Sequence, residues 1–245
     1  MQKKPFSIAL FLVLSSYILG LVTYRNNLFP LNFYRDFGQS NPASAIFQCP
    51  TTTDRFGTVL SGLHFHTDFS DLGILVGDSV IEFVYDPRPY GLDGWVDVAL
   101  SGQTTQCLLS EIGSYTALSP KEAMLYIGGN DIDRSVPMNE ICNNYELIVG
   151  AFLESGISLA LHEIHYGLDD RRSHALVEGV NDCINRIASE HAIQVIETPQ
   201  GFRYSDLGEA TETSIDGEHL NHKGYAIWMR YLSENLPSIE AGPAL

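Results

Sequence analysis

The stretch ILVGDSVIEF, residues 74–83, contains the signal that decides the fold. It opens with three apolar residues, a run typical of a short strand buried on both faces. The run stops at a Gly-Asp pair, Ser79 follows, and a second apolar-rich segment begins at Val80. This order predicts a buried strand that passes directly into a helix, with one hydroxyl group at the junction.

The rest of the chain repeats this alternation. Further short apolar runs lie at Trp95–Leu100, Ala123–Ile127, Ile157–Leu161 and Ile193–Ile196. Helix-like segments begin at Thr104, Met138, Arg172 and Asn221. In the third of these, apolar side chains recur on one face at helical spacing: Leu176, Val180, Cys183, Ile184 and Ile187. Alternating strands and helices predict an α/β fold, a parallel sheet with helices on both faces.

Candidate site residues follow several of the predicted strands. Ser79 follows the first, Gly102 the second and Asn130 the third, and Asp216 stands three residues before His219, ahead of the last helix. Sites in parallel sheets form just beyond the carboxyl ends of the strands. We therefore expect these residues to meet at one edge of the sheet.

Their chemistry is complementary. A serine hydroxyl needs a base to become a nucleophile, and a neutral imidazole is such a base near pH 7. A carboxylate hydrogen-bonded to the other ring nitrogen fixes the tautomer of the imidazole. These requirements predict a hydrogen-bonded triad of Ser79, His219 and Asp216. The backbone N–H groups of Ser79 and Gly102 and the amide of Asn130 are candidate donors to an oxyanion.

Four blocks resemble the signature of the SGNH/GDSL hydrolases (GDSL-like lipases and acylhydrolases). They are Gly-Asp-Ser79, Gly102 in LSGQTT, Gly-x-Asn130-Asp and Asp216-x-x-His219-Leu-Asn, in that order, and the resemblance covers residues 72–236. It implies a flavodoxin-like three-layer α/β/α sandwich with about five parallel strands. It also implies a catalytic triad of Ser79, Asp216 and His219, and an oxyanion hole of Ser79, Gly102 and Asn130.

The chain departs from the family pattern at two positions. Val80 stands where Leu usually follows the serine, a position that we expect to serve packing. Asp97 stands where many members of the family carry Asn.

The resemblance implies a serine esterase that works through an acyl-enzyme on Ser79, without a cofactor or a metal ion. We favour short-chain substrates, above all O-acetyl esters of glycans. Lipid or lysophospholipid esters are an alternative, and so is transfer of the acyl group to a cell-envelope glycan. A non-enzymatic, glycan-binding relative of the fold is the remaining rival.

The N-terminus predicts a membrane partner. Lys3 and Lys4 precede an apolar run of about 20 residues that ends near Tyr24, which suits a bilayer-spanning helix. We favour an uncleaved, single-pass anchor at 1–24 with the catalytic domain outside the cytoplasm, periplasmic or extracellular; a cleaved signal peptide and secretion are the alternative. An irregular extension at 25–70 and the hydrolase domain at 71–245 would follow. The formal charge of −16, with 14 basic against 30 acidic residues, disfavours nucleic acid as a partner.

Three other features stay open or are discounted. The cysteines Cys49, Cys107, Cys142 and Cys183 allow three full pairings, and free thiols are an equal alternative. His64, His66, His162 and His165 form no recognisable set of metal ligands. His165 follows the fourth predicted strand and could line the mouth of the site. The aromatic residues Phe83, Tyr85, Tyr90 and Trp95 predict packing, with a substrate wall as the alternative.

Overall fold

The computed structural model describes residues 49–52, 68–84, 86–165, 173–199 and 213–239. Five strands form one parallel sheet: β1 (Gly73–Gly77), β2 (Trp95–Asp97), β3 (Glu122–Tyr126), β4 (Ser158–His162) and β5 (Gln194–Ile196). Their order is β2-β1-β3-β4-β5, the doubly wound order of flavodoxin-like folds. The predicted fold class is therefore confirmed.

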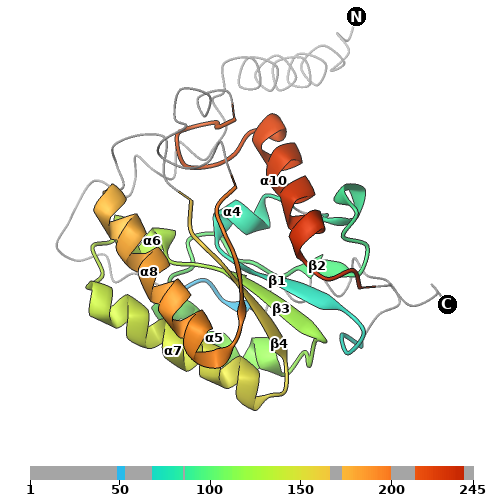
Figure 1. The fold of residues 1–245 in the computed structure, drawn as a ribbon, viewed down its shortest axis with the longest axis horizontal. Helices are drawn as coiled ribbons and strands as arrows, with labels where there is room; N and C mark the ends of the chain where they lie inside the picture. Colours follow the sequence, from blue (N-terminus) through green and yellow to red (C-terminus); the bar gives the residue numbers. More distant parts are fainter. Residues whose placement is uncertain (1–48, 53–67, 85, 166–172, 200–212, 240–245) are drawn as a thin grey trace, which may run out of the picture. The chain divides into compact units, whose positions relative to one another are not determined.

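The direction of each crossover places the helices. From β2 to β5 the chain moves across the sheet in one direction, through α5 (Thr105–Thr116), α7 (Met138–Glu154) and α8 (His174–His191). Right-handed crossovers put all three on the same face, and Figure 1 shows them side by side there. The step from β1 to β2 runs the other way, so α4 (Ser79–Glu82) lies on the opposite face with α10 (His222–Asn235).

The order of the strands creates a switch point between β1 and β3. The chain leaves β1 toward one edge of the sheet and leaves β3 toward the other. Crevices form at such points, beyond the carboxyl ends of the two strands. The short helices that follow them, α4 and α6 (Gly129–Asp133), carry Ser79 and Asn130. The topology thus brings two of the predicted blocks to one crevice.

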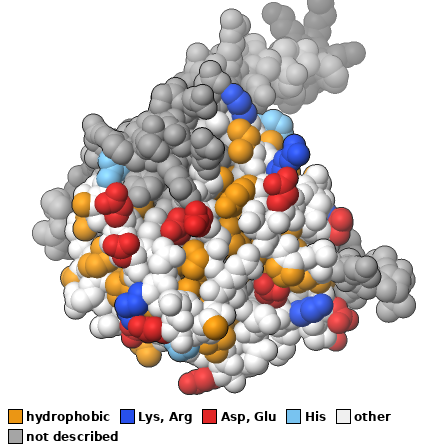
Figure 2. Space-filling view, in the orientation of Figure 1, with side chains coloured by type: hydrophobic (Ala, Val, Ile, Leu, Met, Phe, Trp, Pro, Cys, Tyr) orange, Lys and Arg blue, Asp and Glu red, His pale blue; other side chains and the backbone are white. Residues whose placement is uncertain are grey.

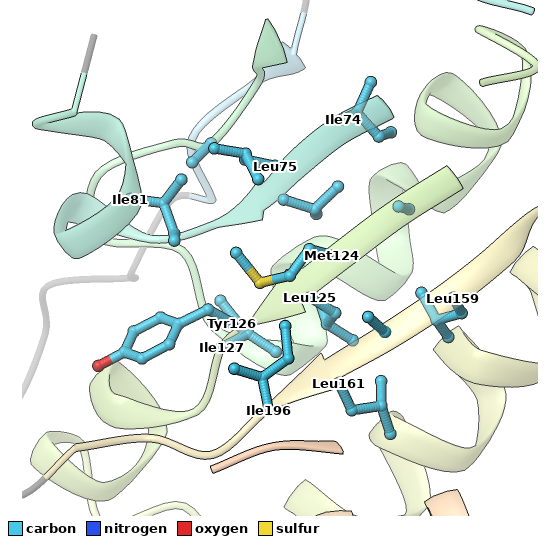
Figure 3. Close-up of a cluster of buried hydrophobic side chains, with 14 of the residues drawn as sticks. Ile74, Leu75, Ile81, Met124, Leu125, Tyr126, Ile127, Leu159, Leu161 and Ile196 are labelled. Atoms are coloured by element: carbon cyan, nitrogen blue, oxygen red, sulfur yellow. The ribbon is translucent and has the colours of Figure 1, made fainter. Parts of the chain in front are cut away.

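The core lies on both faces of this sheet. Figure 3 shows side chains from β1, β3, β4 and β5 in one cluster, among them Leu75, Met124, Leu161 and Ile196. Each of these four is at most 1% exposed. Burial on both faces explains why the strands read as continuous apolar runs instead of alternating ones.

The second strand is shorter than predicted. It ends at Asp97 and not at Leu100. The Asp97 carboxylate accepts a hydrogen bond from the Ala99 N–H at 2.9 Å, a local turn that competes with strand pairing. The chain still follows β1 beyond the strand, because the Leu100 N–H donates to the Gly77 carbonyl at 3.0 Å. An Asn oxygen could accept the same bond, so this departure from the family pattern preserves the local geometry.

One helix, α8, differs from the sequence prediction in its first residue and in one position of its buried face. α8 begins at His174, with Ser173 as its N-cap, and not at Arg172. Leu176, predicted on the buried face, is 42% exposed, whereas Val177 is fully buried. The remaining predicted positions, from Val180 to Ile187, are buried as expected.

The four cysteines form two disulfides. Cys49 pairs with Cys107 on α5, and Cys142 on α7 pairs with Cys183 on α8, with Cα–Cα distances of 5.3 and 5.9 Å. The structure thus selects one of the three pairings that the sequence left open.

The N-terminal predictions lie largely outside the described residues. Residues 1–24 and most of 25–70 belong to this part, so the predicted domain boundaries stay predictions. Within the described ranges, no helix combines the length and the apolar character that crossing a membrane requires. On the face in Figure 2, acidic side chains lie among neutral and hydrophobic ones with few basic side chains, as the net charge leads one to expect.

Candidate active site

Ser79 lies at the tight junction between β1 and α4. Asp78 is the N-cap of α4, and its carboxylate accepts the Val80 N–H at 3.0 Å. At Gly77 an added Cβ would stand 2.4 Å from the Tyr126 carbonyl oxygen, so only glycine fits beside β3. The junction is therefore fixed, and Ser79 is 8% exposed.

Ser79, His219 and Asp216 form one hydrogen-bonded chain. The Ser79 Oγ lies 2.8 Å from His219 Nε2, and His219 Nδ1 lies 2.9 Å from Asp216 Oδ2. A carboxylate only accepts, so Nδ1 carries a proton. In the neutral ring Nε2 is then the acceptor, and the Ser79 hydroxyl donates to it. The structure brings the three predicted residues together in the order that proton transfer requires.

The turn that carries Asp216 and His219 is held from within. The other carboxylate oxygen of Asp216 accepts the backbone N–H groups of His219 and Glu218 at 2.8 and 3.0 Å. Ser214 and Leu220 form an antiparallel bridge across the base of the turn. The three-residue spacing thus closes a loop in which Asp216 binds both the backbone and the ring of the same histidine.

A buried histidine supports this turn from below. His165 Nε2 donates to the Glu218 carbonyl at 3.2 Å, and its Nδ1 lies 2.5 Å from the Tyr126 hydroxyl. The sequence suggested that His165 could line the mouth of the site, but its side chain is only 5% exposed. It supports the turn instead of meeting solvent.

The environment separates the pKa values of the pair. Burial alone would lower the pKa of His219, but the hydrogen bond to Asp216 and its charge raise it above the usual value. Burial would raise the pKa of Asp216, and the hydrogen bonds from the His219 ring and the two backbone N–H groups hold it far below the usual value. Asp216 is therefore a carboxylate at neutral pH, and the protonated form of His219 is stabilised by its partner.

Phe83 flanks the histidine. Its ring centroid lies 5.0 Å from that of His219, with the planes tilted by 36°. Among the aromatic residues noted in the sequence, Trp95 is core packing at 2% exposed, whereas Phe83 contacts the site directly. Tyr85 lies outside the described residues.

The predicted oxyanion residues lie on connected segments. Gly102 has φ +76, a left-handed conformation that favours glycine. Gln103 follows Gly102, and its carbonyl accepts a hydrogen bond from the Asn130 side chain at 3.0 Å. Glu82, the last residue of α4, accepts the Ser101 N–H at 2.7 Å. The helix that begins with Ser79 thus holds the turn that contains Gly102, and Asn130 holds its far side.

Asp131, beside Asn130, has a different role. It is fully buried and accepts the backbone N–H and the hydroxyl of Thr105, at 3.0 and 2.6 Å. Burial raises the pKa of this carboxyl, and the Thr105 hydrogen bonds oppose the shift. Asp131 therefore fastens α6 to the start of α5.

The histidines discounted as metal ligands divide in two. His64 and His66 lie outside the described residues. His162 is fully buried, accepts the Trp228 indole N–H at Nε2 and donates from Nδ1 to the Glu163 carbonyl. Burial lowers its pKa to about 4, so it stays neutral. Both of its nitrogens are engaged, and the described part of the chain contains no group of three or more residues suited to hold a metal ion.

Two supporting residues were not predicted from the sequence: Glu82, and Arg134, whose guanidinium donates to the Gly102 carbonyl at 3.1 Å. Glu82 and Arg134 stand three and four residues after Ser79 and Asn130, so each lies one helical turn from a predicted site residue. That spacing was a usable signal. The supporting contact of His165 offered no such signal, because its partner Glu218 lies 53 residues away in the chain.

Comparison with known proteins gives one family. Residues 76–227 match the model of the GDSL-like Lipase/Acylhydrolase family. No protein with a curated description matches the chain.

Solved structures share the fold at low sequence identity. A GDSL-like lipase from Bacteroides thetaiotaomicron VPI-5482 has a TM-score of 0.61 at 14% identity, over 76% of this chain and 98% of that one. A psychrotrophic esterase from Pseudoalteromonas sp., solved with monoethylphosphonate as inhibitor, has a TM-score of 0.54 at 16% identity, over 66% and 94%. An acetyl xylan esterase has a TM-score of 0.51 at 16% identity, over 66% of this chain and 96% of that one.

Proposed function

The chain belongs to the GDSL-like lipase/acylhydrolase family, a family of ester hydrolases, and from this premise we propose that it cleaves carboxylic esters through an acyl-enzyme on Ser79. One observation carries the proposal. The Ser79 hydroxyl, both nitrogens of His219 and the Asp216 carboxylate form a single chain of hydrogen bonds of 2.8 and 2.9 Å. Such a hydrogen-bonded triad activates a serine as the nucleophile in acyl transfer.

Acylation begins when the Ser79 oxygen attacks the ester carbonyl carbon. His219 Nε2 takes the hydroxyl proton, and Asp216 stabilises the imidazolium that results. The tetrahedral intermediate collapses, the bond to the alkoxy oxygen breaks, and His219 protonates the departing alcohol. In the second half, water attacks the acyl-enzyme and gives its proton to His219. The carboxylic acid leaves, and Ser79 recovers its proton.

The oxyanion is stabilised by the segments around Ser79. The N–H groups of Ser79 and Gly102 and the amide of Asn130 are its donors. The Asn130 amide has two N–H bonds, and one of them goes to Gln103, which aims the group. Donors fixed in this way need no reorganisation as charge develops.

We favour short acyl esters of glycans as the substrates. The family resemblance suggests shallow sites, and the shared fold with an acetyl xylan esterase supports an acetyl group. Lipid esters and transfer to a glycan acceptor use the same acyl-enzyme.

Residues 1–24 are proposed to anchor this domain outside the cytoplasm. The apolar run behind Lys3 and Lys4 suits a signal anchor, and two disulfides suit an oxidising compartment. The anchored chain should resist alkaline extraction from membranes. Recovery of a trimmed chain in the soluble fraction would contradict the anchor.

The test of catalysis uses the full chain in a mild detergent. We would compare hydrolysis of p-nitrophenyl acetate, butyrate and octanoate by the wild type, by Ser79→Ala and by Ser155→Ala. Ser155 is an exposed serine at the end of α7, so it is a matched control. Ser79→Ala should lower kcat by roughly 10³-fold or more. A wild type no faster than Ser79→Ala on every ester and with every added glycan acceptor would refute the esterase and the transferase together.

A further inference from the structure

The turn at Ser101–Gln103 is held on its far side by two side chains that come from one element. Asn130 lies in α6, and Arg134 is the C-cap of the same helix, one turn later. The Asn130 amide donates to the Gln103 carbonyl at 3.0 Å, and Arg134 Nη1 donates to the Gly102 carbonyl at 3.1 Å. Two side chains one helical turn apart therefore clamp two consecutive carbonyl groups.

The conformation of Gly102 makes this clamp consequential. At φ +76 Gly102 has a left-handed backbone conformation, which glycine adopts easily. Because glycine has no side chain, this conformation must be held by contacts to the backbone. The hydrogen bond from Arg134 to the Gly102 carbonyl limits rotation of the peptide plane that joins Gly102 to Gln103. On the other side, Glu82 accepts the Ser101 N–H and hydroxyl. The peptide plane that carries the Gly102 N–H thus joins two planes that are each held by a side chain, one acidic and one basic.

Arg134 also brings positive charge to an acidic neighbourhood. Desolvation lowers the pKa of its guanidinium, while the charges of four carboxylates raise it: Asp131, Asp133, Asp78 and Glu218. Without Arg134 these carboxylates would oppose an oxyanion that forms nearby. Its Nη2 lies 3.9 Å from the place of a Cβ on Gly102, so the guanidinium lies close to this residue.

We infer that Arg134 is a positioning residue of the oxyanion hole, which restrains the Gly102 N–H by holding the adjoining peptide plane through the Gly102 carbonyl and offsets the negative field of the surrounding carboxylates. The inference rests on the proposed function, because it assigns Arg134 to the intermediate formed on Ser79. The exposed side chain is screened by water, so its effect is smaller than that of a direct donor.

The inference predicts a defect in kcat. In the full chain, Arg134→Ala should lower kcat for p-nitrophenyl acetate about 10- to 30-fold. KM should change less than about threefold, because the ester binds before negative charge develops. Arg134→Lys keeps the charge and one donor and should retain at least about a third of wild-type kcat.

Chemical rescue separates this role from a structural one. Guanidinium at about 20 mM, far below the molar concentrations that unfold proteins, should raise the rate of Arg134→Ala several-fold. The same salt should leave the wild type unchanged. Arg186→Ala is the matched control, because that exposed arginine on α8 pairs with Glu146 and Glu190. It should keep full activity and show no rescue.

The outcomes are distinct. Arg134→Ala within twofold of wild-type kcat would overturn the inference and leave the esterase intact. A loss that neither guanidinium nor Arg134→Lys repairs would also overturn it, because the defect would then be a general distortion. If the wild type is no faster than Ser79→Ala, the proposed function fails, and the role of Arg134 falls with it.

Discussion

Replacing Asp216 with Asn tests the electrostatic part of the site. Asn keeps one oxygen, which can still accept the backbone N–H groups of Glu218 and His219. Its NH₂ group then faces His219 Nδ1 and donates to it, so the ring proton moves to Nε2. In this tautomer Nε2 can no longer accept the Ser79 proton. The substitution thus removes a charge and disfavours the working tautomer without removing volume.

The size of the electrostatic loss follows from the geometry. With Oδ2 and Nδ1 2.9 Å apart, the centres of charge of carboxylate and imidazolium are about 4 Å apart, which gives about 4 kcal/mol at an effective dielectric constant of about 20. The Asp216 side chain is 36% exposed, and solvent screening reduces this to about 2–3 kcal/mol. At 1.36 kcal/mol per factor of ten, kcat should fall at least about 30- to 160-fold. The tautomer change adds to this loss.

The pH profile of the activity tests the direction in which Asp216 shifts the pKa of His219. Asp216 raises the pKa of His219, and only the neutral ring acts as a base, so kcat/KM of the wild type rises with pH through a midpoint above the usual histidine value. In Asp216→Asn the raising interaction is lost, and the midpoint should move to lower pH. The assay is hydrolysis of p-nitrophenyl acetate from pH 5 to 9, with Asp182→Asn, an exposed carboxylate on α8, as the control for net charge. A loss of less than fivefold, or a midpoint that moves upward, would refute the reasoning.

Two further predictions concern backbone conformation and buried charge. Gly102→Ala places a side chain at φ +76, and it should cost about 1 kcal/mol of stability and lower kcat roughly tenfold. Gly113→Ala is the control, because Gly113 lies in a helix with open space around an added Cβ, and it should stabilise the fold slightly. Equal effects of the two variants in urea melts and activity assays would count against a strained turn at Gly102. Because burial lowers the pKa of His162 to about 4, the unfolded chain binds more protons between roughly pH 6.5 and 4, and about 3 kcal/mol of stability is lost as pH falls through this range. His162→Gln should be less stable at pH 7 but flatter toward pH 4, and an unchanged pH dependence of the urea midpoint would contradict this account.

The sequence predicted the core of the site because its parts are local. Gly-Asp-Ser79 at a strand end and Asp216-x-x-His219 in one turn are contiguous motifs. A carboxylate three residues before a histidine can reach both its ring and its backbone N–H, and the structure contains both contacts. The family resemblance then joined the two motifs, which are 140 residues apart in the chain.

The supporting contacts could not be predicted in this way. His165 offered only its place after a strand, and its contact with the Glu218 carbonyl depends on how the C-terminal turn lies over β4. The end of β2 at Asp97 depended on a side-chain bond to Ala99 that competes with the ladder. Helical periodicity allowed both Leu176 and Val177 on the buried face of α8, and packing against the sheet chose Val177.

The sequence by itself determined the parallel sheet, the class of chemistry and the residues at its centre. Apolar runs set by burial and short motifs at strand ends are readable wherever neighbours in the chain are neighbours in space. Only the tertiary structure decided the strand order, the pairing of the cysteines and the clamp of Asn130 and Arg134 on the turn at Gly102. The physical reason is that these contacts join distant segments, and the energy of each depends on geometry that only the packed sheet and its helices provide.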